Sequence, residues 1–224
     1  MTEREWLTCA DPKAMLGFLR HRASPRKLRL FAVACYRRVS GLAGLSEVAV
    51  AERVAEGLAT EDELAEARAE SVRGDEQSVG PFSYVPPPEH VLLSLGAGLA
   101  VTASPASDAA EAASGKAVLV AGDGELPGQA ALLCDIFGPL LFRPVPIDPA
   151  WLTWNGGAVR KLAEAAYAER SLPAGTLECH RLAVLADALE EAGCTEPEIL
   201  EHCRQQGSLH VRGCWVIDLL LGRA

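Results

Sequence analysis

The residues able to carry out chemistry are concentrated in the last part of the chain, residues 194–224. This stretch holds three of the seven cysteines and two of the five histidines. Zinc is bound by Cys sulfur, His nitrogen and carboxylate oxygen, and structural sites take four such ligands in a tetrahedron. These residues define a candidate metal site, with zinc as the possible ion and with ligands drawn from Cys194, His202, Cys203, His210 and Cys214, although we predict no obligatory cofactor.

Local structure decides whether these side chains can meet. If residues 211–221 are helical from the first turn, His210 and Cys214 lie four apart on one face. His202 closes the preceding helix and Cys194 precedes it, so all five would converge around a turn at 205–209. The spacing C-x7-H-C-x6-H-x3-C differs from that of standard zinc fingers, and the chain has no C-x-x-C pair. The interpretation that we prefer from the sequence is that the cysteines are buried as small hydrophobic residues, the histidines cap helix ends, and the stretch closes a helical core.

A second kind of chemistry would pair a thiol with a histidine. Cys203 or Cys214 could be activated by His180, His202 or His210, because an adjacent imidazole lowers the pKa of a thiol. Such an enzyme also needs an orienting Asn or Asp and an oxyanion hole, and the sequence identifies neither. The phosphate-binding pattern G-x-x-x-x-G-K-[ST] does not occur. We assign no catalytic or cofactor-binding residue and expect a protein that is not an enzyme.

Composition predicts the elements that position these residues. The chain is 49% hydrophobic but only 5% aromatic, and Ala and Leu supply most of the apolar residues. Ala and Leu favour helices, whereas strands favour β-branched and aromatic residues. We expect an all-α fold, a compact multi-helix bundle of short capped helices in one domain, residues 1–224. Its N-terminal helices occupy residues 1–73, a variable Ala-rich middle with Pro/Gly loops occupies 74–129, and C-terminal helices occupy 130–224.

Start signals place the individual helices. Capping boxes begin at Thr2, Thr60 and Thr195, each with Glu three residues later. A capping residue followed by Pro marks further starts at Asp11, Ser24, Ser104 and Asp148. The expected helices cover residues 2–9, 11–21, 25–41, 46–59, 60–73, 89–103, 104–121, 130–137, 158–170, 177–192, 195–204 and 211–221. A short helical turn at 149–154 ends at a break, Asn155-Gly156-Gly157, and the prolines at 86–88 indicate a linker rather than a polyproline ligand.

Charge is distributed unevenly along the chain. The net charge is −9, but residues 1–40 hold nine Lys/Arg and three Asp/Glu, which is a net +6. One interpretation is a partner-binding surface on the helix from Pro25, formed by Arg26, Lys27, Arg29, Arg37 and Arg38. The other is that the basic helices pack beside acidic ones in the same fold. The acidic remainder makes nucleic acid an unlikely partner, and an unidentified protein is the partner we expect.

The polar N-terminus has no hydrophobic signal region, and no apolar run is long enough to span a membrane. We expect a cytoplasmic protein with no membrane partner, in which the seven cysteines stay reduced. The best functional prediction is a non-catalytic protein-interaction or scaffold domain. A zinc-stabilised binding module is the alternative, and a thiol-dependent enzyme comes third.

Several motifs carry a family resemblance. They are W-L-x-C-x-D-P-x-x-M-L-x-F-L-R and S-x-R-K-L-R-L-F-A-x-A-C-x-R-R-V near the N-terminus, and L-L-C-D-I-F-G, F-R-P-V-x-x-D-P-A-W-L-T-W-N, L-A-D-A-L-E-E-A-G-C and H-V-R-G-C-W-V-I-D-L-L-L-G further on. Over residues 4–55 and 130–222 the chain resembles an uncharacterised helical protein family expanded in planctomycetes. The resemblance implies a helical, Ala-rich middle of variable length and no particular activity. Tyr36 stands where the family pattern has a second Cys, which argues against an essential pair of adjacent thiols.

Overall fold

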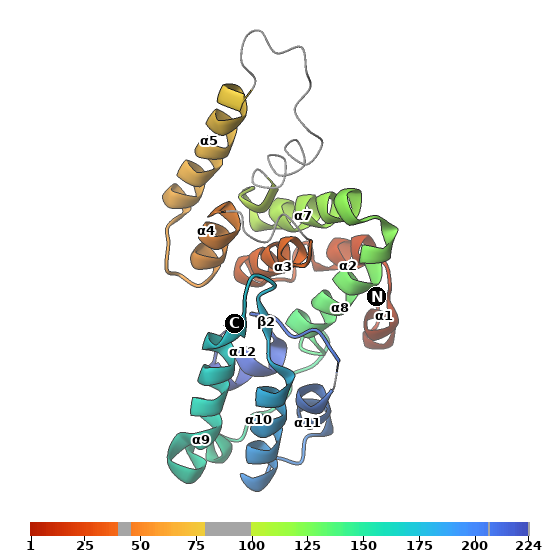
Figure 1. Cartoon of the computed structure of the whole chain (residues 1–224). Helices are drawn as coiled ribbons and strands as arrows, with labels where there is room; N and C mark the ends of the chain where they lie inside the picture. The colour runs from red at the N-terminus through yellow and green to blue at the C-terminus, as the bar shows by residue number, and fades with distance from the viewer. Residues whose placement is uncertain (40–45, 79–99, 206, 224) are drawn as a thin grey trace. The chain divides into compact units, whose positions relative to one another are not determined.

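The computed structural model describes residues 1–39, 46–78, 100–205 and 207–223. Within these residues the chain forms eleven α-helices, one 3-10 helix and a single two-stranded sheet (Figure 1). The prediction of an all-α fold is confirmed. The proline linker at 86–88 and most of the helix expected at 89–103 lie outside the described residues. None of the described helices combines the length and the apolar character needed to cross a membrane.

The chain divides into two compact units, and each is described by itself. One unit is Cys9–Ala130, and the other joins Met1–Thr8 to Ala131–Ala224. The division falls inside helix α8, Leu126–Phe137. Our expectation of a single domain over the whole chain stays a prediction.

The unit Cys9–Ala130 is built around helix α3. Its elements are α2 (Pro12–Leu19), α3 (Pro25–Arg38), α4 (Ser46–Ala55), α5 (Glu61–Ser78), α7 (Ala106–Ala121) and the 3-10 helix η1 (Asp123–Glu125). Helix α3 packs against both α4 and α7 (Figure 1). Every residue from Lys27 to Tyr36 is buried, so α3 is the core of this unit rather than an amphipathic surface helix.

The arginines of α3 have acidic or carbonyl partners inside the same unit. Arg37 Nη2 lies 2.7 Å from Glu52 Oε2, and Arg38 Nε lies 2.7 Å from Glu125 Oε1. The remaining contacts are Arg26 with Glu56 at 3.2 Å, and buried Arg29 with Glu61 at 3.5 Å and the Ala103 carbonyl at 3.2 Å, while Lys27 is itself buried. This arrangement is the one expected if the basic helix packs beside acidic ones. The predicted partner-binding role of these five residues stays a prediction.

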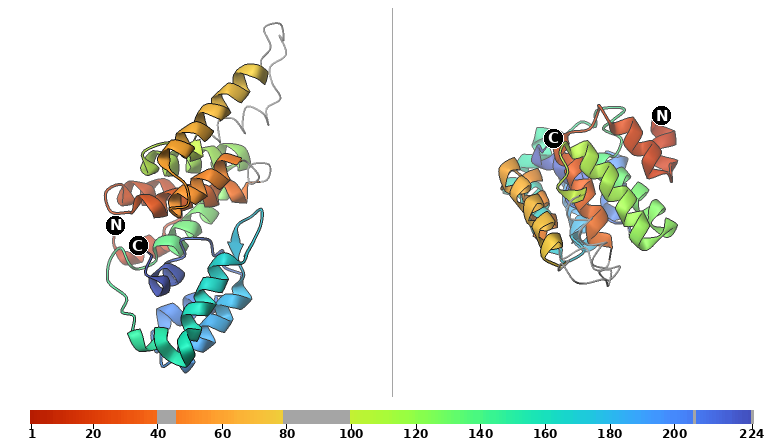
Figure 2. Two further views of the ribbon diagram at one scale, coloured as in Figure 1. Left: turned by 90° about the vertical axis from the view of Figure 1, so that its left-hand side faces the viewer. Right: turned by 90° about the horizontal axis from the view of Figure 1, so that it is seen from above.

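The second unit contains the helices that carry the Cys and His residues. Its elements are α1 (Glu3–Thr8), the end of α8, α9 (Pro149–Ala168), β1 (Arg170–Ser171), β2 (Thr176–Leu177), α10 (Cys179–Glu191), α11 (Pro197–Arg204) and α12 (Trp215–Leu221). Helices α9 and α10 lie side by side and are joined by the β1–β2 hairpin (Figures 1 and 2). Fully buried Val159, Leu182, Leu185, Val216 and Ile217 form the centre of the core.

The N-terminal helix belongs to this second unit although it begins the chain. The predicted capping box forms, since Thr2 N donates to Glu5 Oε2 at 2.7 Å and Glu5 N donates to Thr2 Oγ1 at 3.3 Å. Trp6 is fully buried and meets the Phe137 ring edge-on, with ring centroids 6.3 Å apart. An aromatic pair of this kind adds about 1 kcal/mol beyond the area it buries. Long-range packing thus fixes α1 against the end of α8.

Several of the predicted helix starts after residue 100 are wrong. The box at Thr195 does not form, because α11 begins at Pro197 with Glu196 as its N-cap and no side-chain capping bond. Helix α7 begins at Ala106, with Pro105 rather than Ser104 at the N-cap. Helix α12 begins at Trp215 instead of residue 211. The predicted break in α9 is confirmed, with φ of +46° at Asn155 and left-handed angles at the two glycines after it.

Candidate metal centre

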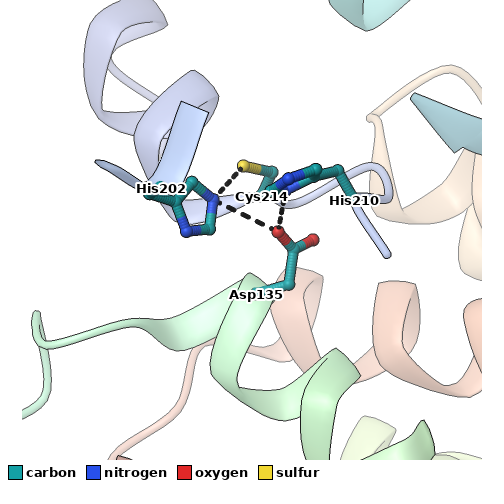
Figure 3. A group of neighbouring side chains, drawn as sticks. All are labelled: Asp135, His202, His210 and Cys214. Carbon is teal, nitrogen blue, oxygen red and sulfur yellow. Dashed lines mark hydrogen bonds and ion pairs between the residues drawn. The ribbon is translucent and has the colours of Figure 1, made fainter. Parts of the chain in front are cut away.

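Four side chains from separate segments of the second unit converge on one point. They are Asp135 from α8, His202 from α11, His210 from the segment before α12, and Cys214 at the N-cap of α12 (Figure 3). Each offers one ligand atom, and the four atoms all lie within 4.8 Å of one another. Asp135, His210 and Cys214 are buried, and only the His202 side chain is partly exposed, at 14%.

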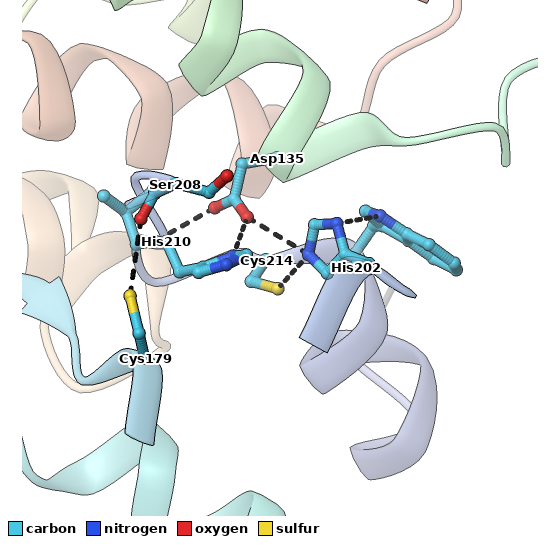
Figure 4. A network of polar contacts seen from close by, with 8 residues as sticks. Asp135, Cys179, His202, Ser208, His210 and Cys214 are labelled. Atoms are coloured by element: carbon cyan, nitrogen blue, oxygen red, sulfur yellow. Dashed lines mark hydrogen bonds and ion pairs between the residues drawn. The ribbon is translucent and has the colours of Figure 1, made fainter. Parts of the chain in front are cut away.

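Asp135 holds the centre together through both carboxylate oxygens. Its Oδ1 accepts from His210 Nδ1 at 2.7 Å (Figure 4). Its Oδ2 accepts from the backbone N–H of Val211 at 2.9 Å. Burial opposes ionisation of Asp135, but hydrogen bonds and charges from His202 and His210 outweigh it and lower the pKa of this carboxyl to about 2. Asp135 is therefore a buried carboxylate at neutral pH.

A β-hairpin and a tight turn position His210 and Cys214. The Leu177 N–H of β2 donates to the His210 carbonyl at 2.8 Å, and Thr176 forms a bridge to Val211. The Cys214 N–H then closes a turn onto the Val211 carbonyl at 3.0 Å, with Gly213 at φ +90°. Because this pairing takes residues 210–213 out of the helix, α12 begins later than its apolar pattern indicates. The predicted convergence of His210 and Cys214 comes from a turn and not from one helical face.

His202 faces the centre with one nitrogen and a tryptophan with the other. Its Nε2 lies 3.1 Å from Cys214 Sγ and 3.3 Å from Asp135 Oδ1 (Figures 3 and 4). Its Nδ1 accepts a hydrogen bond from the indole N–H of Trp215 at 3.1 Å. Trp215 in turn lies directly over Gly138, where a Cβ would be 2.5 Å from the indole Cγ. The tryptophan is thus held between His202 and the end of α8.

Cys214 is fully buried, and its electrostatic surroundings oppose ionisation. Burial raises the pKa of the Cys214 thiol well above its ordinary value, and the negative charge of Asp135 raises it further. A thiolate at this position therefore needs a nearby cation. A divalent metal ion supplies that charge and deprotonates a coordinating thiol.

The other predicted metal ligands lie in the hydrophobic core of the same unit. Cys194 is 2% exposed and Cys203 is 1% exposed, and neither belongs to the group of four. Burial raises the pKa of Cys203 to about 12, with further contributions from the charge of Asp135 and from Cys194. Of the five residues predicted from the sequence, the structure brings together His202, His210 and Cys214.

Asp135 is not among the residues predicted to form the site. It lies on α8 among Leu132, Leu133 and Ile136, which are fully buried. A carboxylate is rarely buried in such an apolar run unless it is paired or binds a metal ion. The motif L-L-C-D-I-F-G therefore contained the signal, namely an acidic residue on the core side of a short apolar helix.

The geometry does not support catalysis by a thiol. In a Cys–His–acid triad the imidazole contacts the nucleophile and the acid through different nitrogens. Here His202 Nε2 faces both Cys214 and Asp135, while Nδ1 is occupied by Trp215. His180 is 71% exposed and lies beside Glu178. With Cys214 fully buried, no substrate can reach its sulfur without opening the core.

The donor set and its dimensions fit a transition-metal ion. Zinc–ligand bonds of 2.0–2.3 Å imply ligand-to-ligand distances of about 3.3–3.8 Å in a tetrahedron. The measured separations of 2.7, 3.1 and 3.3 Å, with all four atoms inside 4.8 Å, require adjustments of only a few tenths of an ångström to about 1 Å. One sulfur, two imidazoles and one carboxylate suit zinc, whereas Mg²⁺ and Ca²⁺ take oxygen ligands.

No protein-family model, curated protein or solved structure matches the chain. The functional interpretation therefore depends on the geometry of the centre, and the family resemblance drawn from the motifs stays a prediction.

Proposed function

We propose that the unit formed by residues 1–8 and 131–224 is a zinc-stabilised, non-catalytic binding module. The observation that supports this proposal is the convergence of Asp135, His202, His210 and Cys214 within 4.8 Å, in a largely buried position. Zinc held at this centre would neutralise the buried Asp135 carboxylate and a Cys214 thiolate together. We place the protein in a reducing, cytoplasmic compartment, because all seven cysteines are free.

The ion would act by linking elements that are far apart along the chain. Asp135 and Cys214 are separated by most of the unit, and the segments between them form α9, the hairpin, α10 and α11. An unfolded chain has no preformed site of this kind, so the free energy of metal binding adds to the stability of the folded state. This role needs no substrate access, which agrees with the burial of three of the four side chains.

Metal content of the purified full chain tests the proposal. We expect about one zinc per chain after purification without chelator or metal-affinity steps, and a melting temperature that falls on treatment with chelator and recovers on adding zinc. Cys214→Ser should abolish metal retention. Cys203→Ser is the matched control, because Cys203 is equally buried in the same unit but lies outside the group of four. A wild-type protein with no bound metal, and with a melting temperature unaffected by chelator and by zinc, would contradict the proposal.

A further inference from the structure

The two histidines of the metal centre differ in what fixes their protons. A neutral imidazole carries one N–H and one lone pair, and a metal ion binds only the lone pair. The partner of the second nitrogen therefore decides whether the first can bind a metal. His202 and His210 have different partners at that position, and the difference assigns them different roles.

The tautomer of His202 is set by Trp215. An indole N–H can only donate, so His202 Nδ1, 3.1 Å from Trp215 Nε1, must present its lone pair. The hydrogen of neutral His202 then lies on Nε2, the nitrogen that faces Cys214 and Asp135. Trp215 is 3% exposed and its ring lies over Gly138, so the indole is buried and held in place. An N–H on Nε2 is a hydrogen-bond donor and cannot be a metal ligand.

His210 is constrained at one nitrogen only: without a metal ion the Asp135 carboxylate takes the Nδ1 hydrogen, but the hydrogen can move to Nε2 if a metal ion binds Nδ1. Its Nδ1 faces Asp135 at 2.7 Å, and its Nε2 is buried without a hydrogen-bond partner among the described residues. Nothing on Nε2 therefore selects a tautomer. His210 can hold its hydrogen on Nδ1 and donate it to Asp135, or hold it on Nε2 and offer Nδ1 to a metal ion. The group beside Nδ1, either the Asp135 carboxylate or a metal ion, decides between these two forms.

We infer that His202 lies outside the coordination sphere and is a positioning residue, which donates its Nε2 hydrogen to the Cys214 thiolate. The ion then has three protein ligands, Asp135, His210 and Cys214. One coordination position would then be left for water or a small anion. This inference depends on the proposed function, since it assigns roles within the same centre. The 3.1 Å separation of His202 Nε2 from Cys214 Sγ fits a hydrogen bond to sulfur.

Cobalt substitution of the full chain separates ligands from positioning residues. Co²⁺ takes the place of zinc and absorbs visible light, and a thiolate ligand adds a charge-transfer band in the near ultraviolet. His202→Gln retains an N–H donor near Nε2, and His202→Leu removes it. We expect His202→Gln to bind one Co²⁺ within about tenfold of the wild-type affinity. His202→Leu should weaken binding about 10–100-fold and shift the thiolate band, with a tetrahedral spectrum retained.

The ligand variants give the contrast. His210→Gln and Cys214→Ser should each lose more than about 100-fold in affinity, and Cys214→Ser should also lose the thiolate band. Adding azide to the wild-type cobalt protein should change its visible spectrum, because azide would replace the water or small anion at the fourth coordination position. Loss of Co²⁺ from His202→Gln as complete as from His210→Gln, or a spectrum indifferent to azide, would overturn the inference. If the wild-type chain binds neither zinc nor cobalt, the proposed function itself fails. If it binds them and the His202 variants behave as ligand variants, only the present inference fails.

Discussion

At the scale of single residues, Asp135 accepts hydrogen bonds through both oxygens, one from a histidine ring and one from the Val211 backbone. Asp135→Asn keeps the shape but removes the negative charge, and only one of its two terminal atoms can still accept a hydrogen bond. We expect a loss of about 3 kcal/mol in the free energy of unfolding. Urea denaturation of the chelator-treated protein measures this loss. The matched control is Asp187→Asn, where the side chain is 68% exposed beside Arg204 and should cost less than about 1 kcal/mol. Equal losses in the two variants would contradict the assigned role of Asp135.

The same carboxylate predicts how stability depends on pH. The pKa of Asp135 is lowered to about 2 from an ordinary value of 3.8, so the folded state holds the ionised form more strongly than the unfolded state does. The stabilisation of the folded state by ionised Asp135 is present above pH 3.8. It is lost as the pH falls from 3.8 toward 2. Urea unfolding of the metal-free protein between pH 5 and pH 2 should show this loss, and Asp135→Asn should show a shallower dependence. If the free energy of unfolding of Asp135→Asn depended on pH as steeply as that of the wild type, other carboxylates would be responsible for the acid sensitivity.

Sequence could predict part of the centre because Cys and His are rare and were close together in the chain. His202, His210 and Cys214 lie within thirteen consecutive residues, 202–214, and all three join the group. Asp135 is 67 residues before His202, and only the fold brings it there. The chain has thirty Asp and Glu residues, and only the buried position of Asp135 on α8 distinguishes it as a candidate ligand.

At the scale of elements, local signals predicted helix starts well where the capping residues act alone. The box at Thr60 forms, with Glu63 N donating to Thr60 Oγ1 at 3.1 Å and Thr60 N donating to Glu63 Oε2 at 2.7 Å. The same pattern at Thr195 fails, because the helix starts one residue later, with Pro197 in its first turn. Glu198 instead pairs with Arg143. Tertiary pairing of this kind cannot be read from a four-residue pattern.

The two threonines provide a paired test of capping. Thr60→Ala removes an N-cap hydrogen bond and should lower the free energy of unfolding by about 1 kcal/mol. Thr195→Ala removes an exposed side chain with no capping bond and should change it by less than about 0.5 kcal/mol. Chemical denaturation of both variants beside the wild type gives the comparison. A larger loss at Thr195 than at Thr60 would show that the box forms at 195 after all.

Helix α8 ends where Trp215 lies against the backbone, and this contact explains why residue 138 is glycine. Gly138 has φ +51°, and an added Cβ would meet the indole at 2.5 Å. Gly138→Ala should therefore cost more than about 3 kcal/mol, from backbone strain together with displacement of Trp215. Gly57→Ala is the control, because φ is +69° there with open space around it, and strain alone should cost about 1–2 kcal/mol. Thermal or urea denaturation distinguishes the two, and similar losses would mean that Trp215 moves aside freely.

At the scale of the whole molecule, composition predicted the all-α class because Ala and Leu are the main apolar residues. The two strands that do form are only two residues long, so they need few residues with a strand preference. Composition could not predict that residues 1–8 join the unit of residues 131–224. That assignment depends on Trp6 packing on Phe137 and on Arg143 contacting Glu3, contacts between residues well over a hundred positions apart. Charge asymmetry was visible in the sequence, but its acidic partners on α4, α5 and η1 appear only in the folded unit Cys9–Ala130.

The location of the metal centre inside one unit predicts where the protein responds to zinc. All four converging residues belong to the unit of residues 1–8 and 131–224. Zinc at a free concentration of 100 times its Kd should stabilise the folded state by about 2.7 kcal/mol, provided that the unfolded chain does not bind it. Amide hydrogen exchange of the full chain, with zinc and with chelator, should therefore show increased protection in α10, α11 and α12. Helices α3 and α7 lie in the other unit and serve as the internal control. Their exchange should stay unchanged, and zinc-dependent protection there that equals the change in α11 would contradict a centre contained within one unit.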